Sequence, residues 1–270
     1  MMNVAAIQMV STDTVAENLE MAQKLITEAV SDQAKLVTLP ENFPLMGKED
    51  ADRLAIVEQF GSGPLQSFLA EQSKQHQIWL LGGTIPLQSH VADKVLAASL
   101  LYSPEGVCVA HYDKIHLFDV LVDETNEESY KESNTFEPGN SVTVAETDIG
   151  NIGLSVCYDL RFPELYRKMH DNNVQIITAP SAFTATTGEA HWQSLLKTRA
   201  IENLCYVIAS NQGGTHANGR ETWGHSMIID PWGSILACVD KGPGVAIAAI
   251  DLDKQTKLRN MFPTLEHRKL

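Results

Sequence analysis

Apolar residues follow two different spacings in the first forty positions of the chain. Residues 3–9 and 34–40 are short apolar runs typical of buried strands. Between them, residues 14–30 carry apolar side chains at helical spacing, with Asp13 and Thr14 as candidate N-caps. The pattern predicts a strand, a helix and a second strand.

The next hundred residues repeat this order and then change to a hairpin. Residues 64–76 have helical spacing and lead into the apolar run 78–86, which ends in Gly and Pro turn signals. Residues 94–114 contain two apolar runs on either side of Ser-Pro-Glu-Gly, a pattern that predicts a β-hairpin.

The second half of the chain continues in the same way. A helix is predicted at 189–203, and strands are predicted at 174–180, 205–211, 225–239 and 244–253. We find no repeat and no linker that would divide the chain. The sequence therefore predicts one α/β domain in which helices cover a mixed sheet system.

Composition narrows the class of protein. The 270 residues include 44% hydrophobic and 20% charged residues, which is typical of a soluble globular protein. The formal net charge of −14 would repel a phosphate backbone, so we expect no nucleic-acid partner. No apolar run approaches the roughly 18 residues that span a bilayer, and the N-terminus lacks a basic region followed by a long apolar one. We expect a cytoplasmic protein without a membrane partner.

The four cysteines lie far apart, without a C-x-x-C pair or a histidine at zinc-finger spacing. No G-x-G-x-x-G, phosphate-loop or H-E-x-x-H motif occurs either, so we expect no cofactor and no metal. Cys108, Cys205 and Cys238 lie in apolar runs and are expected to be buried and inert. We interpret the acidic residues 123–129 as a solvated loop that borders a substrate entrance. Residues 211–219, "NQGGTHANG", are expected to form a flexible loop.

Cys157 differs from the other three cysteines. It follows the apolar residues 152–156 and precedes Pro163, which suits the first position of a helix, and the acidic Glu164. The cysteine thus lies on a turn between a strand and a helix. Such turns expose side chains where ligand crevices form in α/β folds, and they leave N–H groups free. This position is suited to a nucleophile.

Two further titratable residues follow apolar strands. Glu41 lies between two prolines in "TLPENFP", where an apolar strand ends, and Lys114 lies in "HYDKIHLFD" just after the second hairpin strand. If strands lying side by side in one sheet end at the same edge, Glu41, Lys114 and Cys157 converge in one crevice. Alone, Glu41 and Lys114 would be ordinary solvated side chains.

Three segments, "LPENF", "YDKIHLFD" and "SVCYDLRFPELYR", closely resemble the glutamate, lysine and cysteine motifs of the nitrilase superfamily of carbon-nitrogen hydrolases, in the order of that family. The likeness extends to the residues from 180 onward. It implies an α/β fold of four layers, an α/β/β/α sandwich, that pairs into homodimers or higher homo-oligomers. We expect residues 1–250 to form the carbon-nitrogen hydrolase domain and residues 251–270 to extend that domain.

Within the superfamily, "RFPE", "PSAF", "HSMIIDPWG" and "FPTLEHRKL" are most similar to the branch that hydrolyses deaminated glutathione. The neighbouring branch, the omega-amidases, acts on alpha-ketoglutaramate, and "KIHLFD" is similar to it. The resemblance implies a small-molecule amide with a deaminated glutamine-like group, which is hydrolysed to a carboxylate and ammonia through a cysteine thioester. It leaves open which amide, or a nitrile, is preferred.

The resemblance also implies a role for each residue of the crevice. Cys157 is the nucleophile, and Glu41 is the general base for both half-reactions. Lys114 and the backbone N–H of Tyr158 stabilise the oxyanion, and Glu132, ahead of "EPG", orients Lys114. With its ammonium about 4 Å from the sulfur, Lys114 would contribute about 4 kcal/mol at an effective dielectric near 20. We therefore expect a resting thiolate.

Arg161, four residues after the cysteine, is expected to bind a substrate carboxylate with its planar guanidinium. The alternative is a structural salt bridge from Arg161 to Glu164 or Asp159. Phe183 and Thr187 match pocket positions of the family.

Two other classes of function remain open. "GLSVC" partly matches the G-x-S-x-G motif of serine hydrolases, which would make Ser155 the nucleophile, and His225 and His267 follow it in the order that an α/β-hydrolase requires. The chain could also be a noncatalytic binding protein that uses its thiol as a ligand contact or redox sensor. The combination of Glu41, Lys114 and Cys157 favours an enzyme, because binding alone does not require it.

Overall fold

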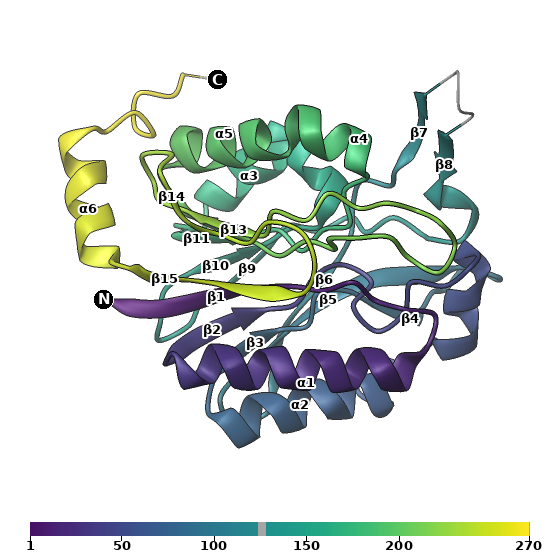
Figure 1. The fold of residues 1–270 in the computed structure, drawn as a ribbon. Helices are drawn as coiled ribbons and strands as arrows, with labels where there is room; N and C mark the ends of the chain where they lie inside the picture. Colours follow the sequence, from purple (N-terminus) through teal and green to yellow (C-terminus); the bar gives the residue numbers. More distant parts are fainter. Residues whose placement is uncertain (124–127, 270) are drawn as a thin grey trace.

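Two β-sheets lie face to face in the computed structural model, and helices cover the outer face of each (Figure 1). The fold is the expected four-layer α/β/β/α sandwich. The structure describes residues 1–123 and 128–269. Most of the acidic segment 123–129, which we interpreted as a solvated loop at a substrate entrance, lies outside the described residues.

The first sheet combines parallel and antiparallel strands. β1 is parallel to β2, and β2 is parallel to β3, while the remaining neighbours are antiparallel. Its strands are, in order across the sheet, β15 (Gly244–Ile250), β1 (Met2–Gln8), β2 (Ala34–Thr38), β3 (Trp79–Leu81), β5 (Val95–Tyr102) and β4 (Ile85–Gln88), with β6 (Cys108–Asp113) also paired to β5. β5 and β6 form the predicted hairpin.

The second sheet has a parallel centre and antiparallel edges. Its strands are, in order, β14 (Ile235–Cys238), β13 (Met227–Ile229), β12 (Tyr206–Ala209), β11 (Ile176–Thr178), β10 (Ile152–Leu154) and β9 (Thr143–Ala145). A separate hairpin of β7 (Asp119–Asp123) and β8 (Glu128–Lys131) projects from one end of the sandwich (Figure 1).

Most of the longer helices lie where the sequence pattern predicts them. Those of the described chain are α1 (Val15–Ser31), α2 (Pro64–His76), α3 (Pro163–His170), α4 (Ala185–Thr187), α5 (Gln193–Asn203) and α6 (Leu252–Met261). In Figure 1, α1 and α2 lie below the first sheet, and α3 and α5 lie above the second. The apolar spacing predicts α1, α2 and α5, whereas it did not reveal α6. Within the described residues, no helix combines the length and apolar character needed to cross a membrane.

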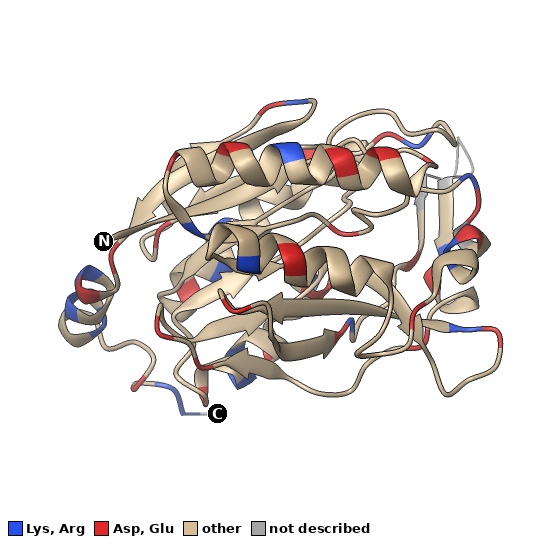
Figure 2. Cartoon of the chain, turned by 90° about the horizontal axis from the view of Figure 1, so that it is seen from below, with Lys and Arg blue, Asp and Glu red and all other residues tan. Residues whose placement is uncertain are grey.

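The helical spacing of α1 explains why it packs on the sheet. Ala22, Leu25, Ile26 and Ala29 recur at intervals of three and four residues and are buried against the sheet core. The opposite side of α1 is exposed, and acidic residues outnumber basic ones along it (Figure 2). Burial of this stripe, at about 25 cal/mol per Å² of apolar surface, fixes the helix on the sheet.

Three local predictions about exposure and capping need correction. Thr14 occupies the N-cap position of α1, but its side chain makes no capping hydrogen bond. Cys205 is buried as expected, whereas Cys108 is half-buried and Cys238 is exposed. Cys238 lies in β14, an edge strand of the second sheet, so a position in an apolar run did not guarantee burial.

Candidate active site

Three predicted site residues lie just beyond the ends of three strands. Glu41 follows β2, Lys114 follows β6 and Cys157 follows β10. The expectation that strands of one sheet bring them together is wrong, because β10 belongs to the second sheet. The stacking of the sheets brings them together instead: the hydroxyl of Ser210, after β12, donates to the carbonyl of Thr38 at the end of β2 at 2.8 Å. The site therefore lies between the two sheets.

A pocket with an empty volume of about 540 Å³ opens at this point. This volume includes space open to solvent, so the site is a wall-lined opening rather than an enclosed cavity. Its wall includes most of the predicted residues, namely Glu41, Glu132, Cys157, Tyr158, Arg161, Phe183 and Thr187. Lys114 lies behind this wall, with only 2% of its side chain exposed. The wall also contains residues that we did not predict: Asn42, Arg53, Phe118, Tyr130, Phe136, Thr184 and Arg220.

The ammonium of Lys114 holds two carboxylates together behind the wall. It donates to Glu41 Oε1 at 2.8 Å and to both carboxylate oxygens of Glu132 at 2.8 Å. Glu132 Oε2 also accepts from the backbone N–H of Phe118 at 2.6 Å. Two carboxylates thus share one ammonium, and this cluster carries a net charge of about −1 when both are ionised.

The pKa values in this cluster follow from burial and from the shared cation. Burial opposes the charge of Glu41, but the charge and hydrogen bond of Lys114 outweigh it and hold the pKa of Glu41 below its ordinary value. Burial also opposes the charge of Lys114, yet Glu132 and Glu41 keep its pKa above the ordinary value. Burial raises the pKa of Glu132, which has to share the ammonium. Glu41 therefore stays ionised and able to accept a proton.

Cys157 has an uncommon backbone conformation. Its φ is +48°, in the left-handed region that residues with a Cβ rarely adopt. Its N–H donates to the carbonyl of Pro180 at 2.9 Å, and it begins the 3₁₀ helix Cys157–Arg161. Such conformations cost about 1–3 kcal/mol and persist where the surrounding structure holds them. Here the conformation places the thiol on the pocket wall.

The expectation of a resting thiolate is wrong. Burial raises the pKa of Cys157 well above its ordinary value, and the neighbouring carboxylate of Glu41 raises it further, while Lys114 and the backbone of Ala182 lower it only in part. The physical reason is that Glu41 and Glu132 already neutralise the ammonium. The resting pair is a neutral thiol that donates to the Glu41 carboxylate.

A buried carboxylate fixes the cysteine turn to the segment that carries the lysine. Asp159 Oδ2 accepts from the N–H of Val156 at 2.8 Å and from the hydroxyl of Tyr112 at 2.7 Å. Its other oxygen accepts from the N–H of His116 at 3.1 Å and lies 2.7 Å from His116 Nδ1. Because Tyr112 and His116 each lie two residues from Lys114, Asp159 sets the position of the ammonium relative to the thiol.

Tyr158 supplies the other predicted group of the crevice. Its N–H belongs to the first turn of a helix, where backbone N–H groups have no intrahelical acceptor. This is the geometry in which backbone N–H groups stabilise anions at helix starts.

Arg161 lies on the pocket wall without an acidic partner among the described residues. Its guanidinium lies over the rings of Tyr158 and Phe183, at 5.7 Å and 5.8 Å from their centroids, and 3.4 Å from His191 Nδ1. The alternative salt bridge to Asp159 or Glu164 is wrong, because Asp159 faces the lysine segment. Arg161 is therefore available to an anionic ligand.

Phe183 and Thr187 lie on the wall as predicted. Phe183 is buried and packs against Trp192, with ring centroids 4.9 Å apart. Thr187 is held in a turn, where its N–H donates to Thr184 Oγ1 at 3.2 Å and its hydroxyl lies 2.9 Å from the same oxygen. Both residues shape the pocket from the segment that follows β11.

Sequence reasoning missed Arg220, because we expected the preceding residues 211–219 to form a flexible loop. That expectation is wrong: Asn211, Gln212 and His216 are buried, and Gln212 donates to the Glu41 carbonyl at 3.1 Å. In Figure 1 the connection between β12 and β13 extends from the second sheet toward the β7–β8 hairpin. The buried polar residues of this loop are the groups that hold it in place.

Ser155 is not a candidate nucleophile. It is fully buried, donates to the carbonyl of Thr178 at 2.7 Å and accepts from the hydroxyl of Tyr166 at 3.0 Å. It does not lie on the pocket wall, and His225 Nδ1 is instead 3.0 Å from the carbonyl of Trp223. Among the residues that the structure describes, no group of three or more His, Cys, Asp or Glu is arranged to hold a metal ion.

Known proteins are similar to this chain over most of its length. The family model for carbon-nitrogen hydrolases matches residues 3–260. A deaminated glutathione amidase from Synechocystis sp. (strain PCC 6803 / GT-S) is 44% identical over 267 residues, which cover 98% of this chain and 97% of that protein. A deaminated glutathione amidase from Yersinia enterocolitica is 38% identical over 268 residues, which cover 99% of this chain and 93% of that protein.

Solved structures are similar over the same extent. The C. elegans NitFhit protein superposes with a TM-score of 0.89 at 34% identity, covering 99% of this chain and 65% of that chain. The Saccharomyces cerevisiae protein Nit3, a member of branch 10 of the nitrilase superfamily, superposes with a TM-score of 0.87 at 28% identity, covering 97% of this chain and 94% of that chain.

Proposed function

This chain belongs to the carbon-nitrogen hydrolase family and is an amidase of the nitrilase superfamily, and from that premise we propose that it hydrolyses deaminated glutathione with Cys157 as the nucleophile. One observation carries the assignment of Cys157: its thiol meets the carboxylate of Glu41 on the wall of a pocket, beside the ammonium of Lys114. A noncatalytic binding site would not require this combination.

In the first half-reaction, Sγ of Cys157 attacks the amide carbon while Glu41 accepts the thiol proton. The electron pair of the carbonyl moves to its oxygen, where the ammonium of Lys114 and the N–H of Tyr158 stabilise the charge. When the tetrahedral intermediate collapses, the C–N bond breaks and the proton on Glu41 passes to the leaving amine. A thioester remains on Cys157.

In the second half-reaction, Glu41 accepts a proton from water, and the resulting nucleophile attacks the thioester carbon. The C–S bond breaks, the thiolate recovers the proton from Glu41, and the carboxylic acid product leaves. Glu132 contacts no reacting atom in this scheme. It holds Lys114 in place through the two hydrogen bonds to its carboxylate.

The substrate assignment corrects one expectation about the products. Deaminated glutathione carries a 2-oxo acid joined through a secondary amide to cysteinylglycine, so its hydrolysis releases that dipeptide as the amine. The expected ammonia belongs to a primary amide such as alpha-ketoglutaramate. Both amides yield 2-oxoglutarate, and we propose that Arg161, on the pocket wall, binds its 2-oxo acid carboxylate.

A side-by-side assay tests this proposal. We expect the purified protein to release 2-oxoglutarate from deaminated glutathione with a kcat/KM at least about tenfold above that for alpha-ketoglutaramate, a difference of about 1.4 kcal/mol. A reversed preference would support an omega-amidase instead. Inactivity on both amides would overturn the substrate assignment, and a nitrile included in the same assay tests the remaining class.

We also propose that the chain forms homodimers. The exposed Trp232 packs its ring against Phe262, with centroids 5.6 Å apart, and Ile201, Leu236 and Met261 are also exposed. Exposed apolar side chains in such number often mark an interface. Sedimentation of the wild type and of Trp232→Ser tests this proposal, and a monomeric wild type would contradict it.

Two further expectations are retained as proposals. We propose that residues 251–270 extend the same domain, because Gln255 of α6 donates to the carbonyls of Gln175 and Leu204 at 2.8 Å. We propose a cytoplasmic location, because free thiols such as that of Cys157 persist in a reducing compartment.

A further inference from the structure

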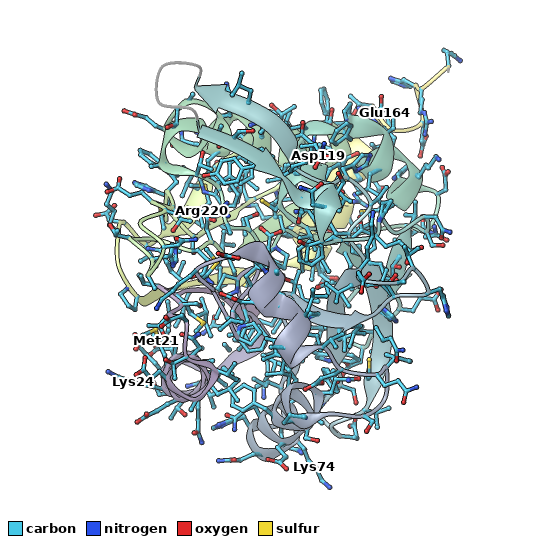
Figure 3. The ribbon with its side chains drawn as sticks, turned by 90° about the vertical axis from the view of Figure 1, so that its right-hand side faces the viewer. Met21, Lys24, Lys74, Asp119, Glu164 and Arg220 are labelled. Carbon is cyan, nitrogen blue, oxygen red and sulfur yellow. The ribbon has the colours of Figure 1, made fainter. Side chains whose placement is uncertain are left out.

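A second arginine of the pocket wall, Arg220, has no acidic partner in the part of the chain that the structure describes. Arg220 donates from Nη2 to the carbonyl of Ala182 at 2.8 Å, and its guanidinium lies 4.8 Å from the ring centroid of Tyr130. Its Nε is buried and finds no hydrogen-bond acceptor among the described residues. Figure 3 shows Arg220 on the face of the molecule that carries the β7–β8 hairpin, where β7 begins at Asp119.

Arg220 has no acidic partner among the described residues although the chain is rich in acidic side chains. Acidic residues outnumber basic ones by 34 to 20, so a basic side chain has many potential partners on the surface. Arg199, for example, pairs with Glu202 at 2.6 Å. A buried N–H without an acceptor is costly, and a guanidinium is suited to bind a carboxylate through two hydrogen bonds. An anionic ligand in the pocket would accept a hydrogen bond from this N–H and would pair with the charge of the guanidinium.

The position of Arg220 indicates which part of the substrate it contacts. The backbone of Ala182 contacts the sulfur of Cys157, and the carbonyl of the same residue accepts from Arg220. Arg220 also lies near enough to Glu41 to help lower the pKa of that carboxyl. In the proposed mechanism Glu41 gives its proton to the departing amine, so Arg220 lies toward the leaving group.

Arg161 reaches the pocket from another element. It ends the 3₁₀ helix Cys157–Arg161 and lies over Phe183, whereas Arg220 comes from the loop between β12 and β13 and binds the carbonyl of Ala182. The two guanidiniums thus approach the segment 182–183 from different elements. A substrate bound between them would carry one anion for each.

We propose that Arg220 binds the carboxylate of the leaving group, so that the pocket selects amides with an anion on each side of the scissile bond. This inference rests on the proposed function. In deaminated glutathione the second anion is the glycine carboxylate, two residues from the scissile nitrogen and therefore about 7 Å away when extended. Alpha-ketoglutaramate has no such group.

A charge-deleted substrate tests the inference. Deaminated glutathione is compared with its glycinamide, which has the same shape but no carboxylate on the leaving group. We expect the wild-type kcat/KM for the glycinamide to be about 10- to 100-fold below that for the acid, mainly because KM is higher. For Arg220→Gln we expect kcat/KM for the acid to fall about 10- to 100-fold below the wild-type value. The fall in kcat/KM for the glycinamide should be at least about tenfold smaller. Arg220→Lys should recover part of the difference, because it restores the charge without the planar geometry.

Matched variants separate this role from a structural one. Arg161→Gln should lower kcat/KM for the acid and the glycinamide by the same factor, since both keep the 2-oxo acid carboxylate. Arg167→Gln, at a residue outside the pocket wall, controls for the loss of one positive charge. Thermal unfolding and circular dichroism of each variant check the fold.

Two outcomes would overturn the inference. One is an equal loss on both substrates in Arg220→Gln, which would show that the guanidinium acts on the loop or on the acyl side. The other is a wild type that does not distinguish the acid from the glycinamide. Failure of the proposed function gives a different result, because the wild type would then hydrolyse neither compound.

Discussion

Two groups of charged residues in the pocket differ in how their charges are paired. Behind the thiol, the ammonium of Lys114 is bound by Glu41 and Glu132 at 2.8 Å, and every charge of the cluster has a partner before a substrate arrives. On the pocket wall, the guanidiniums of Arg161 and Arg220, which together we call the recognition end, lie over aromatic rings and have no acidic partner among the described residues. In the proposed mechanism the cluster around Lys114, the chemical end, is complete by itself, whereas the recognition end is completed by the charges of a ligand.

This difference indicates how each end contributes to turnover. Preorganised charges around the thiol lower the barrier without reorganisation during the reaction, so changes there should affect kcat for every amide. Unpaired cations contribute binding energy only when the substrate carries the matching anion, so changes there should affect KM for particular substrates. Variants at each end should therefore differ in whether they change kcat or KM.

The largest effect is expected for Glu41→Gln. The amide cannot accept the thiol proton, so kcat should fall by about 10³- to 10⁴-fold on every substrate, with little change in KM. Steady-state kinetics on deaminated glutathione and alpha-ketoglutaramate measure this loss. Residual activity within tenfold of the wild type would show that another group is the base.

A smaller loss is expected for Glu132→Gln. The neutral side chain keeps its size but holds Lys114 less firmly, so kcat should fall by about 10²-fold on both amides. Glu164→Gln, at an exposed carboxylate of α3 that is labelled in Figure 3, is the matched control and should retain wild-type kinetics. If the Glu132 variant changed KM alone, Glu132 would belong to the recognition end.

Arg161→Gln should act at the recognition end. We expect KM for alpha-ketoglutaramate to rise about 10- to 100-fold while kcat falls less than threefold, because the lost contact is made in the ground state and the transition state alike. Initial rates over a range of substrate concentrations separate the two constants. If Arg161→Gln lowered kcat as much as Glu132→Gln does, the proposed division between the chemical end and the recognition end would be wrong.

The smallest effect is a shift in the titration of the thiol. Because burial and Glu41 raise the pKa of Cys157, we expect its alkylation by iodoacetamide to increase only at alkaline pH, above the ordinary thiol value of about 8.5. Glu132→Gln removes one negative charge from the cluster and should shift this increase to lower pH. Rapid alkylation of Cys157 at neutral pH that does not change with pH would indicate a thiolate paired with Lys114.

The sequence predicted the elements of the fold more completely than the electrostatics of the site. Helical spacing located α1 and α2, and the quoted motifs identified Glu41, Lys114 and Cys157, because both depend on local pattern. The meeting of two sheets depends on contacts between distant segments, such as Thr38 with Ser210, which no local pattern records.

The state of the thiol and the position of Arg220 on the pocket wall were missed for related reasons. A motif indicates that Lys114 lies near Cys157, but not that two carboxylates already occupy the ammonium. The glycines of residues 211–219 suggested mobility, whereas the buried Gln212 and His216 hold that loop and place Arg220 on the pocket wall. Charge balance and loop order both arise from tertiary contacts.

The most direct test of the account is to trap the acyl-enzyme. A 2-oxoglutaryl ester with a good leaving group makes acylation fast, so that the thioester accumulates and is found by quenched-flow mass spectrometry of the digested protein. We expect a 2-oxoglutaryl adduct on the peptide that contains Cys157, formed with one equivalent of released alcohol per site and absent in Cys157→Ala. An adduct on another residue, or turnover of the ester that persists in Cys157→Ala, would contradict the account.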